Sequence, residues 1–187
     1  MTHQPWPTRD GNRLWVANWA TNDITEIDLQ TGEILRVFPV GERPIEVVVP
    51  ANAKTAYVSV PSLSKMMVFD LETNELAAEP AMLAPENLML SRNGKTILAA
   101  WSGAHFPTAV SIVDTETLTS VGVALPGVSA SHTDVARHAR FGFVSLAGPG
   151  SKSGIAVVDI ESATLHAFYP IPGPGRVHAV RYAPGAP

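Results

Sequence analysis

The sequence contains no cysteine among its 187 residues. This absence excludes disulfide bonds, thiol nucleophiles, zinc–thiolate sites and iron–sulfur clusters. A chain of this length buries enough surface to fold without disulfides. Because secreted proteins can also lack cysteine, the absence does not fix the compartment.

Charge is also scarce, at 16% charged residues and a net charge of −4. Lys and Arg occur singly, without a basic run, so we do not expect a nucleic-acid partner. No apolar stretch approaches the roughly 18 residues that a membrane span requires. Residues 1–13 lack a charged segment followed by an apolar one, so the sequence predicts no secretory signal in this chain.

A sustained helical period is missing as well. The closest stretch, residues 76–90, is interrupted by Pro80 and Pro85. Instead, 14 glycines and 16 prolines are spread between many short apolar runs. This pattern predicts an all-β fold of short strands joined by turns.

Two landmarks recur along the chain. A large apolar residue inside a β-type run returns at intervals of 42, 41 and 45 residues, at Trp15, Tyr57, Leu98 and Phe143. An aspartate ends an apolar strand at intervals of 42, 44 and 45 residues, at Asp28, Asp70, Asp114 and Asp159. Because aspartate binds backbone N–H groups in tight turns, we expect these carboxylates to be structural.

Each repeat is predicted to hold four strands. In the first repeat these are strand b at 13–18, strand c at 24–29, strand d at 33–40 and strand a at 45–49. Four strands per 40–45 residues is typical of a β-propeller blade. We therefore expect one β-propeller domain over residues 1–187, with proline-rich tails and repeats at about 10–49, 50–91, 92–136 and 137–183.

The first repeat resembles the YVTN-type β-propeller repeat of YncE-like and lactonase-like propellers. That repeat starts D-G-k-r-l-Y-V-x-N, continues V-x-x-I-D and T-G, and ends V-G-x-x-P. The matching residues, in order, are Asp10, Gly11, Trp15, Val16, Asn18, Ile27, Asp28, Thr31, Gly32, Val40, Gly41 and Pro44. The later repeats match more loosely, and the resemblance covers about residues 10–183.

The number of repeats leaves the arrangement of the blades open. Families with this repeat mostly build seven-bladed propellers, which need about 300 residues at this period. Four arrangements remain: a closed four-blade ring, half of an eight-blade homodimer, an open arc forming a partial propeller, or a fragment of a longer chain. In a closed ring the last predicted strand, 176–183, would pair with strand b at 13–18.

The loops of a propeller fall on two faces, and the b–c and d–a connections share one of them, usually the ligand face. Binding residues concentrate on such loops. The aromatic residues predicted on or beside the b–c loops are Trp19, Trp101, His105 and Phe106. They either stack on a ligand or cap the interface between blades.

Alignment of strand a across the repeats identifies a second candidate site. Ile45, Glu86, His132 and His178 fall at equivalent positions near the channel mouth, with Arg43, Glu46 and Asp134 close by in sequence. The predicted ligand-binding residues are therefore Arg43, Glu46, Glu86, His132, Asp134 and His178. In this alignment the a–b turn of the third repeat is one residue shorter than the others, so the alignment could slip by one residue.

Two imidazoles and a carboxylate, from His132, His178 and Glu86, could hold a divalent metal. The alternative is that the histidines are hydrogen-bonded plugs in a wet channel. A His–carboxylate pair could also serve in acid–base chemistry.

The predicted function is a non-catalytic binding or scaffold protein of the YVTN-repeat type, with a protein or small-molecule ligand on the b–c and d–a face. The resemblance implies a periplasmic or otherwise extracytoplasmic location. It also implies the alternative, a lactonase-like or oxidoreductase propeller with a metal or haem at the channel mouth, held by His132, His178 and Glu86.

Overall fold

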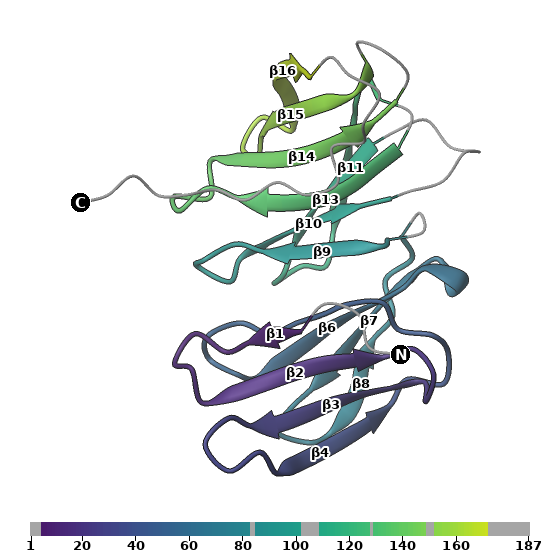
Figure 1. Cartoon of the computed structure of the whole chain (residues 1–187), viewed down its shortest axis with the longest axis vertical. Coiled ribbons are helices and arrows are strands. Elements are labelled where there is room, and N and C mark those ends of the chain that lie inside the picture. The colour runs from purple at the N-terminus through teal and green to yellow at the C-terminus, as the bar shows by residue number, and fades with distance from the viewer. Residues whose placement is uncertain (1–4, 83–84, 102–108, 128, 149–151, 172–187) are drawn as a thin grey trace. The chain divides into compact units, whose positions relative to one another are not determined.

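The structure, a computed structural model, describes residues 5–82, 85–101, 109–127, 129–148 and 152–171. Within them the strands form four four-stranded antiparallel sheets, each a meander of consecutive strands (Figure 1). This confirms the all-β class and the four predicted blades, which we number in chain order. The chain divides into two compact units, Met1–Glu86 with blades 1 and 2, and Asn87–Pro187 with blades 3 and 4.

The first two blades follow the predicted strands closely. Blade 1 consists of β1 (Trp6–Pro7), β2 (Arg13–Asn18), β3 (Asp23–Asp28) and β4 (Ile34–Pro39). Blade 2 consists of β5 (Val47–Val48), β6 (Thr55–Val60), the 3₁₀-helix η1 (Pro61–Leu63), β7 (Lys65–Asp70) and β8 (Glu75–Ala78). The four strands predicted for the first repeat agree with β2 to β5 within two residues at each end.

The other two blades repeat this order. Blade 3 consists of β9 (Asn87–Leu90), β10 (Thr96–Ala100), β11 (Ala109–Asp114) and β12 (Ser120–Ala124). Blade 4 consists of β13 (Ser129–Val135), β14 (Phe141–Ala147), β15 (Gly154–Asp159) and β16 (Thr164–Pro170). Among the described residues, no helix has the length and apolar character needed to cross a membrane.

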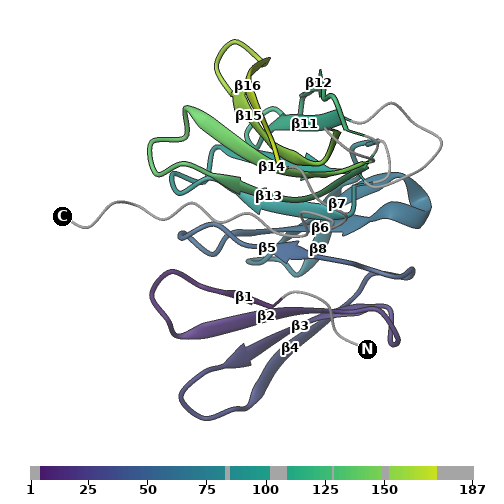
Figure 2. The same ribbon diagram turned by 45° about the horizontal axis from the view of Figure 1, so that its top comes forward.

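The two blades of the first unit share one core (Figure 2). Trp15 on β2 contacts Phe38 on β4 at 5.8 Å between ring centroids, and Phe38 contacts Phe69 on β7 at 5.9 Å. Aromatic pairs at this spacing add to the free energy gained from burying their area. The large apolar landmark of the first repeat therefore lies between two sheets.

Arg36 on β4 makes polar contacts across the same interface. Its Nε lies 2.5 Å from a carboxylate oxygen of the buried Glu26. Its Nη1 donates to the carbonyl oxygen of Leu71 at 2.6 Å and to Oδ1 of Asn74 at 3.0 Å, both in blade 2. The guanidinium also lies over the Trp15 ring, 5.6 Å from its centroid. One arginine thus joins the outer strand of blade 1 to the β7–β8 turn.

The second unit has a core of its own between blades 3 and 4. Its buried polar link joins the first strands of the two blades. Oδ1 of Asn87 on β9 accepts hydrogen bonds from the backbone N–H and the hydroxyl of Thr133 on β13, at 2.7 and 2.8 Å. Because both residues are buried, these bonds satisfy groups that would otherwise be costly to desolvate.

The four landmark aspartates close the turn after the third strand of every blade. Oδ1 of Asp28 accepts the N–H groups of Gln30 and Thr31, at 2.8 and 3.1 Å. Asp70, Asp114 and Asp159 accept the equivalent pairs of N–H groups in their own turns. The structural role predicted for these carboxylates is confirmed.

The first strand of blade 1 differs from the prediction. The sequence analysis assigned no strand before residue 13, and only its closed-ring arrangement placed residues 176–183, which lie outside the described residues, beside strand 13–18. Instead β1 pairs Trp6 with Trp15 and Pro7 with Leu14. The indole N–H of Trp6 donates to the carbonyl oxygen of Val49 at 2.9 Å, and its ring packs on the core. The Trp6 ring buries apolar surface, and its N–H has a hydrogen-bond partner in Val49. These two contacts explain why the proline-flanked segment Trp6–Pro7 packs beside β2.

A glycine substitution tests the close packing of β15 and β16. A Cβ at Gly154 would overlap the carbonyl oxygen of Tyr169 on the paired strand, so Gly154→Ala should destabilise the protein by roughly 1–3 kcal/mol. Gly122 on β12 has open space at its Cβ, so Gly122→Ala should be neutral or slightly stabilising. Urea denaturation measures both, and equal midpoints for the two variants would contradict this packing.

The turn aspartates predict a loss of stability in acid. The backbone N–H groups of the turn residues hold the pKa of Asp28 below its ordinary 3.8, since they stabilise the carboxylate. A lowered pKa stabilises the fold above pH 3.8, and this contribution disappears as the pH falls below that value.

We therefore expect the urea midpoint to fall as the pH is lowered below 3.8, and to fall less in Asp28→Asn, whose amide oxygen still accepts the two N–H groups. Glu33→Gln, in the same turn, is the control, because no hydrogen bond from the turn reaches its carboxylate. A pH profile of Asp28→Asn identical to that of the unmodified protein would count against this role.

Candidate functional site

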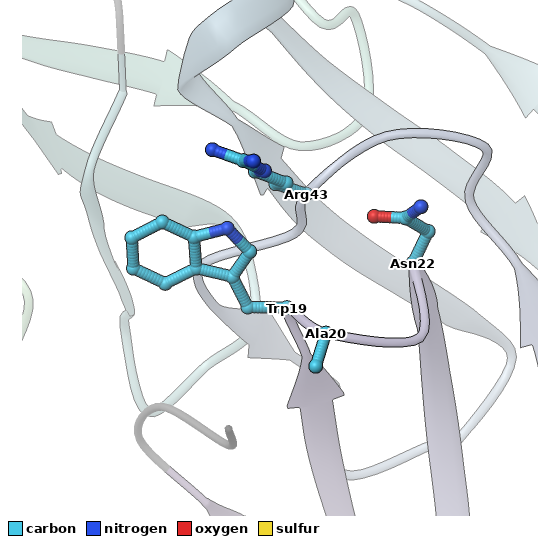
Figure 3. Close-up of a pocket in the computed structure, with 4 residues that line it drawn as sticks. All are labelled: Trp19, Ala20, Asn22 and Arg43. Carbon is cyan, nitrogen blue, oxygen red and sulfur yellow. The ribbon is translucent and has the colours of Figure 1, made fainter.

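An open hollow of 410 Å³ lies at the loop end of blade 1 (Figure 3). Its lining residues are Trp19, Ala20 and Asn22, from the loop between β2 and β3, and Arg43, from the loop between β4 and β5. These are the b–c and d–a connections of the first repeat. The sequence predicted both connections on one face, and in blade 1 they meet at this hollow.

Backbone hydrogen bonds hold the two loops together. Asn22 adopts a left-handed conformation with φ 61°, and its N–H donates to the carbonyl oxygen of Asn18 at 2.9 Å. Its own carbonyl oxygen accepts the N–H groups of Val40 at 2.8 Å and Gly41 at 3.3 Å. Since asparagine tolerates this conformation better than most residues, Asn22 both turns one loop and binds the other.

The base of the β2–β3 loop is fixed by side chains. The amide of Asn18 donates to Oδ1 of Asp23 and to the hydroxyl oxygen of Thr25, each at 2.7 Å. These two acceptors lie on β3, opposite the end of β2. The walls of the hollow are therefore set before any ligand arrives, which lowers the entropy lost on binding.

Arg43 carries the positive charge of the hollow. Its guanidinium carbon lies 5.7 Å from the centroid of the Trp19 ring, in the range of a cation–π contact. Its backbone N–H donates to Oε1 of Glu42 at 3.1 Å. Within the described part of the chain, no acceptor lies within hydrogen-bonding distance of the guanidinium N–H groups. Arg43 is exposed and Trp19 is half-buried.

The predicted site at the channel mouth depended on an alignment of strand a across the repeats. In that alignment, His132 is shifted by one residue relative to the pairing observed in the structure. In all four blades the landmark residue pairs with the residue nine positions before it: Trp6 with Trp15, Val48 with Tyr57, Met89 with Leu98, and Asp134 with Phe143. The turn between strands a and b therefore has one length throughout. The shorter third turn of the sequence alignment was wrong.

The hydrogen bonds agree with the corrected register. The backbone N–H of Glu46 donates to Oγ of Ser59, and that of His132 donates to Oγ of Ser145, each at 2.9 Å. By the same register Asn87 takes this position in blade 3, opposite Ala100. The equivalent residues are thus Glu46, Asn87 and His132, whereas Ile45 and Glu86 fall one position earlier.

The predicted site residues within the described ranges differ in burial. Glu46 is buried at 2% exposure, whereas Glu86, His132 and Asp134 are half-buried. Nδ1 of His132 lies 3.0 Å from the hydroxyl of Ser131, and a carboxylate oxygen of Asp134 accepts the N–H of Val135 at 2.8 Å.

The structure does not test the three predicted metal ligands as a set. Glu86 belongs to the first unit and His132 to the second, and His178 lies outside the described residues. No three His, Asp or Glu side chains of the described residues are grouped to hold a metal ion. The metal site with His178 stays a prediction.

The aromatic residues predicted near the loops divide into two kinds. Trp19 lines the hollow, as a ligand-stacking residue would. Trp101 is only 8% exposed, and its indole N–H lies 3.4 Å from Oγ of Ser111, so it does not lie on the surface as a ligand-stacking residue would. An apolar strand precedes both tryptophans, and the sequence does not distinguish the two environments. His105 and Phe106 lie outside the described residues.

Asn22, like Ala20, lies in the predicted b–c loop, but sequence analysis did not single it out as a site residue. Its signal was present, since an Asn-Asp pair in a tight turn between two strands favours a left-handed residue. The bond from Asn22 to the β4–β5 loop joins segments 18 residues or more apart and leaves no local pattern in the sequence.

Comparisons with known proteins support the fold. No family model matches the chain, and no curated protein matches it in sequence. Among solved structures, hydrazine synthase of Kuenenia stuttgartiensis is similar at a TM-score of 0.81 and 20% identity, over 90% of this chain and 48% of that one. The WD40 repeats of RRP9 are similar at a TM-score of 0.71 and 12% identity, over 87% of this chain and 49% of that one.

The chain therefore spans about half the length of these two structures. At such low identity the similarity establishes a propeller, WD40-like fold and nothing about activity.

Substitution of Asn22 tests how the hollow is held. Asn22→Ala should destabilise the protein by roughly 1 kcal/mol, because alanine is strained at a left-handed φ. Asn22→Gly should be close to neutral, since glycine adopts this conformation freely. Urea denaturation followed by tryptophan fluorescence compares the two. Equal destabilisation would show that the side chain, and not the backbone conformation, holds the loops.

Proposed function

We propose that this chain is a non-catalytic binding or scaffold protein of the YVTN-repeat type, which takes its partner on the loop face that carries the hollow of blade 1. The proposal includes the extracytoplasmic location that the resemblance implies. The observation that carries it is the Trp19–Arg43 pair at an open, pre-formed hollow. Tryptophan and arginine are the side chains most enriched among residues that dominate protein–protein binding energy.

The repeat motif and the hollow use different residues. Motif residues hold the framework: Gly11 and Gly41 adopt positive φ angles in turns, and Asn18 fixes the base of a loop. Arg43 occupies one of the two variable positions of the V-G-x-x-P segment, and Trp19 follows the motif asparagine. The motif thus builds the scaffold, while Trp19 and Arg43, which line the hollow, occupy positions that the motif does not specify.

The enzymatic alternative has less support. It needs His132, His178 and Glu86 at one centre. In the corrected register His132 is equivalent to Asn87 and not to Glu86, so the alignment that suggested this centre no longer supports it. No observation in the described residues favours it over binding, so we do not propose it.

A displayed library of random peptides tests the proposed function. Peptides selected on the intact protein should lose at least about tenfold in affinity to Trp19→Ala and to Arg43→Ala, because truncating a dominant contact costs more than 1 kcal/mol. Affinity for each variant is measured by biolayer interferometry.

The controls match each substitution. Leu76→Ala removes an exposed apolar side chain beside the turn between the third and fourth strands of blade 2, away from the b–c and d–a connections, where Leu76 is 43% exposed. Arg137→Ala removes an exposed arginine from the turn between β13 and β14. Both should bind the selected peptides unchanged. Failure to select any peptide that depends on Trp19 or Arg43 would overturn the proposal.

A further inference from the structure

Three side chains present hydrogen-bonding groups to the hollow of blade 1. Figure 3 shows the indole nitrogen of Trp19 on the side of its ring that faces Arg43, with the amide of Asn22 across the opening. An indole offers one donor, a guanidinium offers five, and an amide offers both donors and acceptors. The hollow is therefore richer in donors than in acceptors.

The charge of Arg43 is not neutralised within the described residues. Arg36 lies 2.5 Å from Glu26, and Arg13 lies 2.6 Å from Asp28, so both of these arginines are paired. No described carboxylate lies within ion-pairing distance of the Arg43 guanidinium. The neighbouring Glu42 instead uses a carboxylate oxygen to accept the backbone N–H of Arg43.

The shape of this donor set selects an anion of a particular geometry. A guanidinium binds a carboxylate through two parallel hydrogen bonds, and such charge-assisted bonds are about twice as strong as neutral ones. The indole N–H can supply a third donor, and the Trp19 ring offers an apolar face for the carbon atoms next to the carboxylate. The net charge of the chain is −4, but at physiological ionic strength charges farther away than a Debye length of about 8 Å are largely screened. The nearby charge of Arg43 therefore determines whether the hollow attracts an anion.

The openness of the hollow favours a ligand carried by a larger molecule. Small-molecule sites enclose most of the surface of their ligand, whereas this hollow is bounded by two loops and open to solvent (Figure 3). A side chain that projects from an extended peptide can enter it without being enclosed.

We infer that the hollow of Trp19, Asn22 and Arg43 binds a carboxylate side chain from an acidic segment of a partner protein. This inference rests on the proposed function, since it names the chemistry of the partner at the same face.

The test uses three peptides that differ only in the side chain at the two Glu positions: acetyl-Phe-Glu-Phe-Glu-amide, its neutral Gln isostere and its cationic Lys analogue. Binding is followed by the indole N–H signal of Trp19 in ¹H–¹⁵N NMR, identified by its loss in Trp19→Phe. We expect the Glu peptide to bind at least about tenfold more tightly than the Gln peptide, and more weakly as salt rises.

A charge reversal provides the decisive variant. Arg43→Glu should lose binding of the Glu peptide and gain binding of the Lys peptide, an outcome that unfolding cannot produce. Arg137→Glu, a reversal at an exposed arginine away from the hollow, should leave the order of the peptides unchanged. A separate titration with benzoate tests whether a free carboxylic acid suffices.

Each outcome decides between the claims. Equal affinity for the Glu and Gln peptides at Trp19 overturns the carboxylate inference and leaves the proposed function standing. Benzoate binding as tight as that of the Glu peptide overturns the protein partner as the source of the carboxylate. No shift of the Trp19 signal with millimolar Glu peptide overturns the inference, and the display experiment then decides the proposed function independently.

Discussion

Every blade of this protein is held in register by the same interaction, an aspartate carboxylate that accepts two backbone N–H groups from the turn following its strand. The side-chain period of a strand is two, so a slip of one residue would exchange its buried and exposed faces. By fixing the turn between the third and fourth strands, Asp28 and its equivalents fix which residues face the core. The b–c and d–a connections lie at the opposite end of each blade, away from these aspartate turns. In blade 1 these connections line the hollow.

The sequence predicted those features of the fold that repeat. The period of Trp15, Tyr57, Leu98 and Phe143 identified four blades because each residue occupies the same paired position on the second strand, where the first three are buried and Phe143 is half-buried. The carboxylate turns were equally predictable, since their geometry involves only three or four consecutive residues. Strand β1 was not predicted, because Trp6–Pro7 is short, proline-flanked and held by one indole hydrogen bond to a residue 43 positions away.

The same contrast between local patterns and long-range contacts applies to the candidate site residues. Trp19 was identified because loop positions at one end of a blade follow from strand order, whereas Arg43 was named because it is close in sequence to the strand a alignment. The His132 alignment failed because it was counted from the end of a strand, which no sequence landmark marks. Counting from the paired landmark Phe143 gives the observed register. Asn22 was missed because its role depends on a long-range bond to Val40 rather than on its neighbours in sequence.

Arg36 has a mechanical consequence. The last strand of a meander is normally attached along one side only, so a pulling force detaches it first, one ladder hydrogen bond after another. Here the guanidinium of Arg36 also donates hydrogen bonds to Leu71 and Asn74 of blade 2. Tension applied to β4 is therefore transmitted to blade 2 through these hydrogen bonds. Separating β4 from its own sheet then also requires breaking its contacts with the neighbouring sheet.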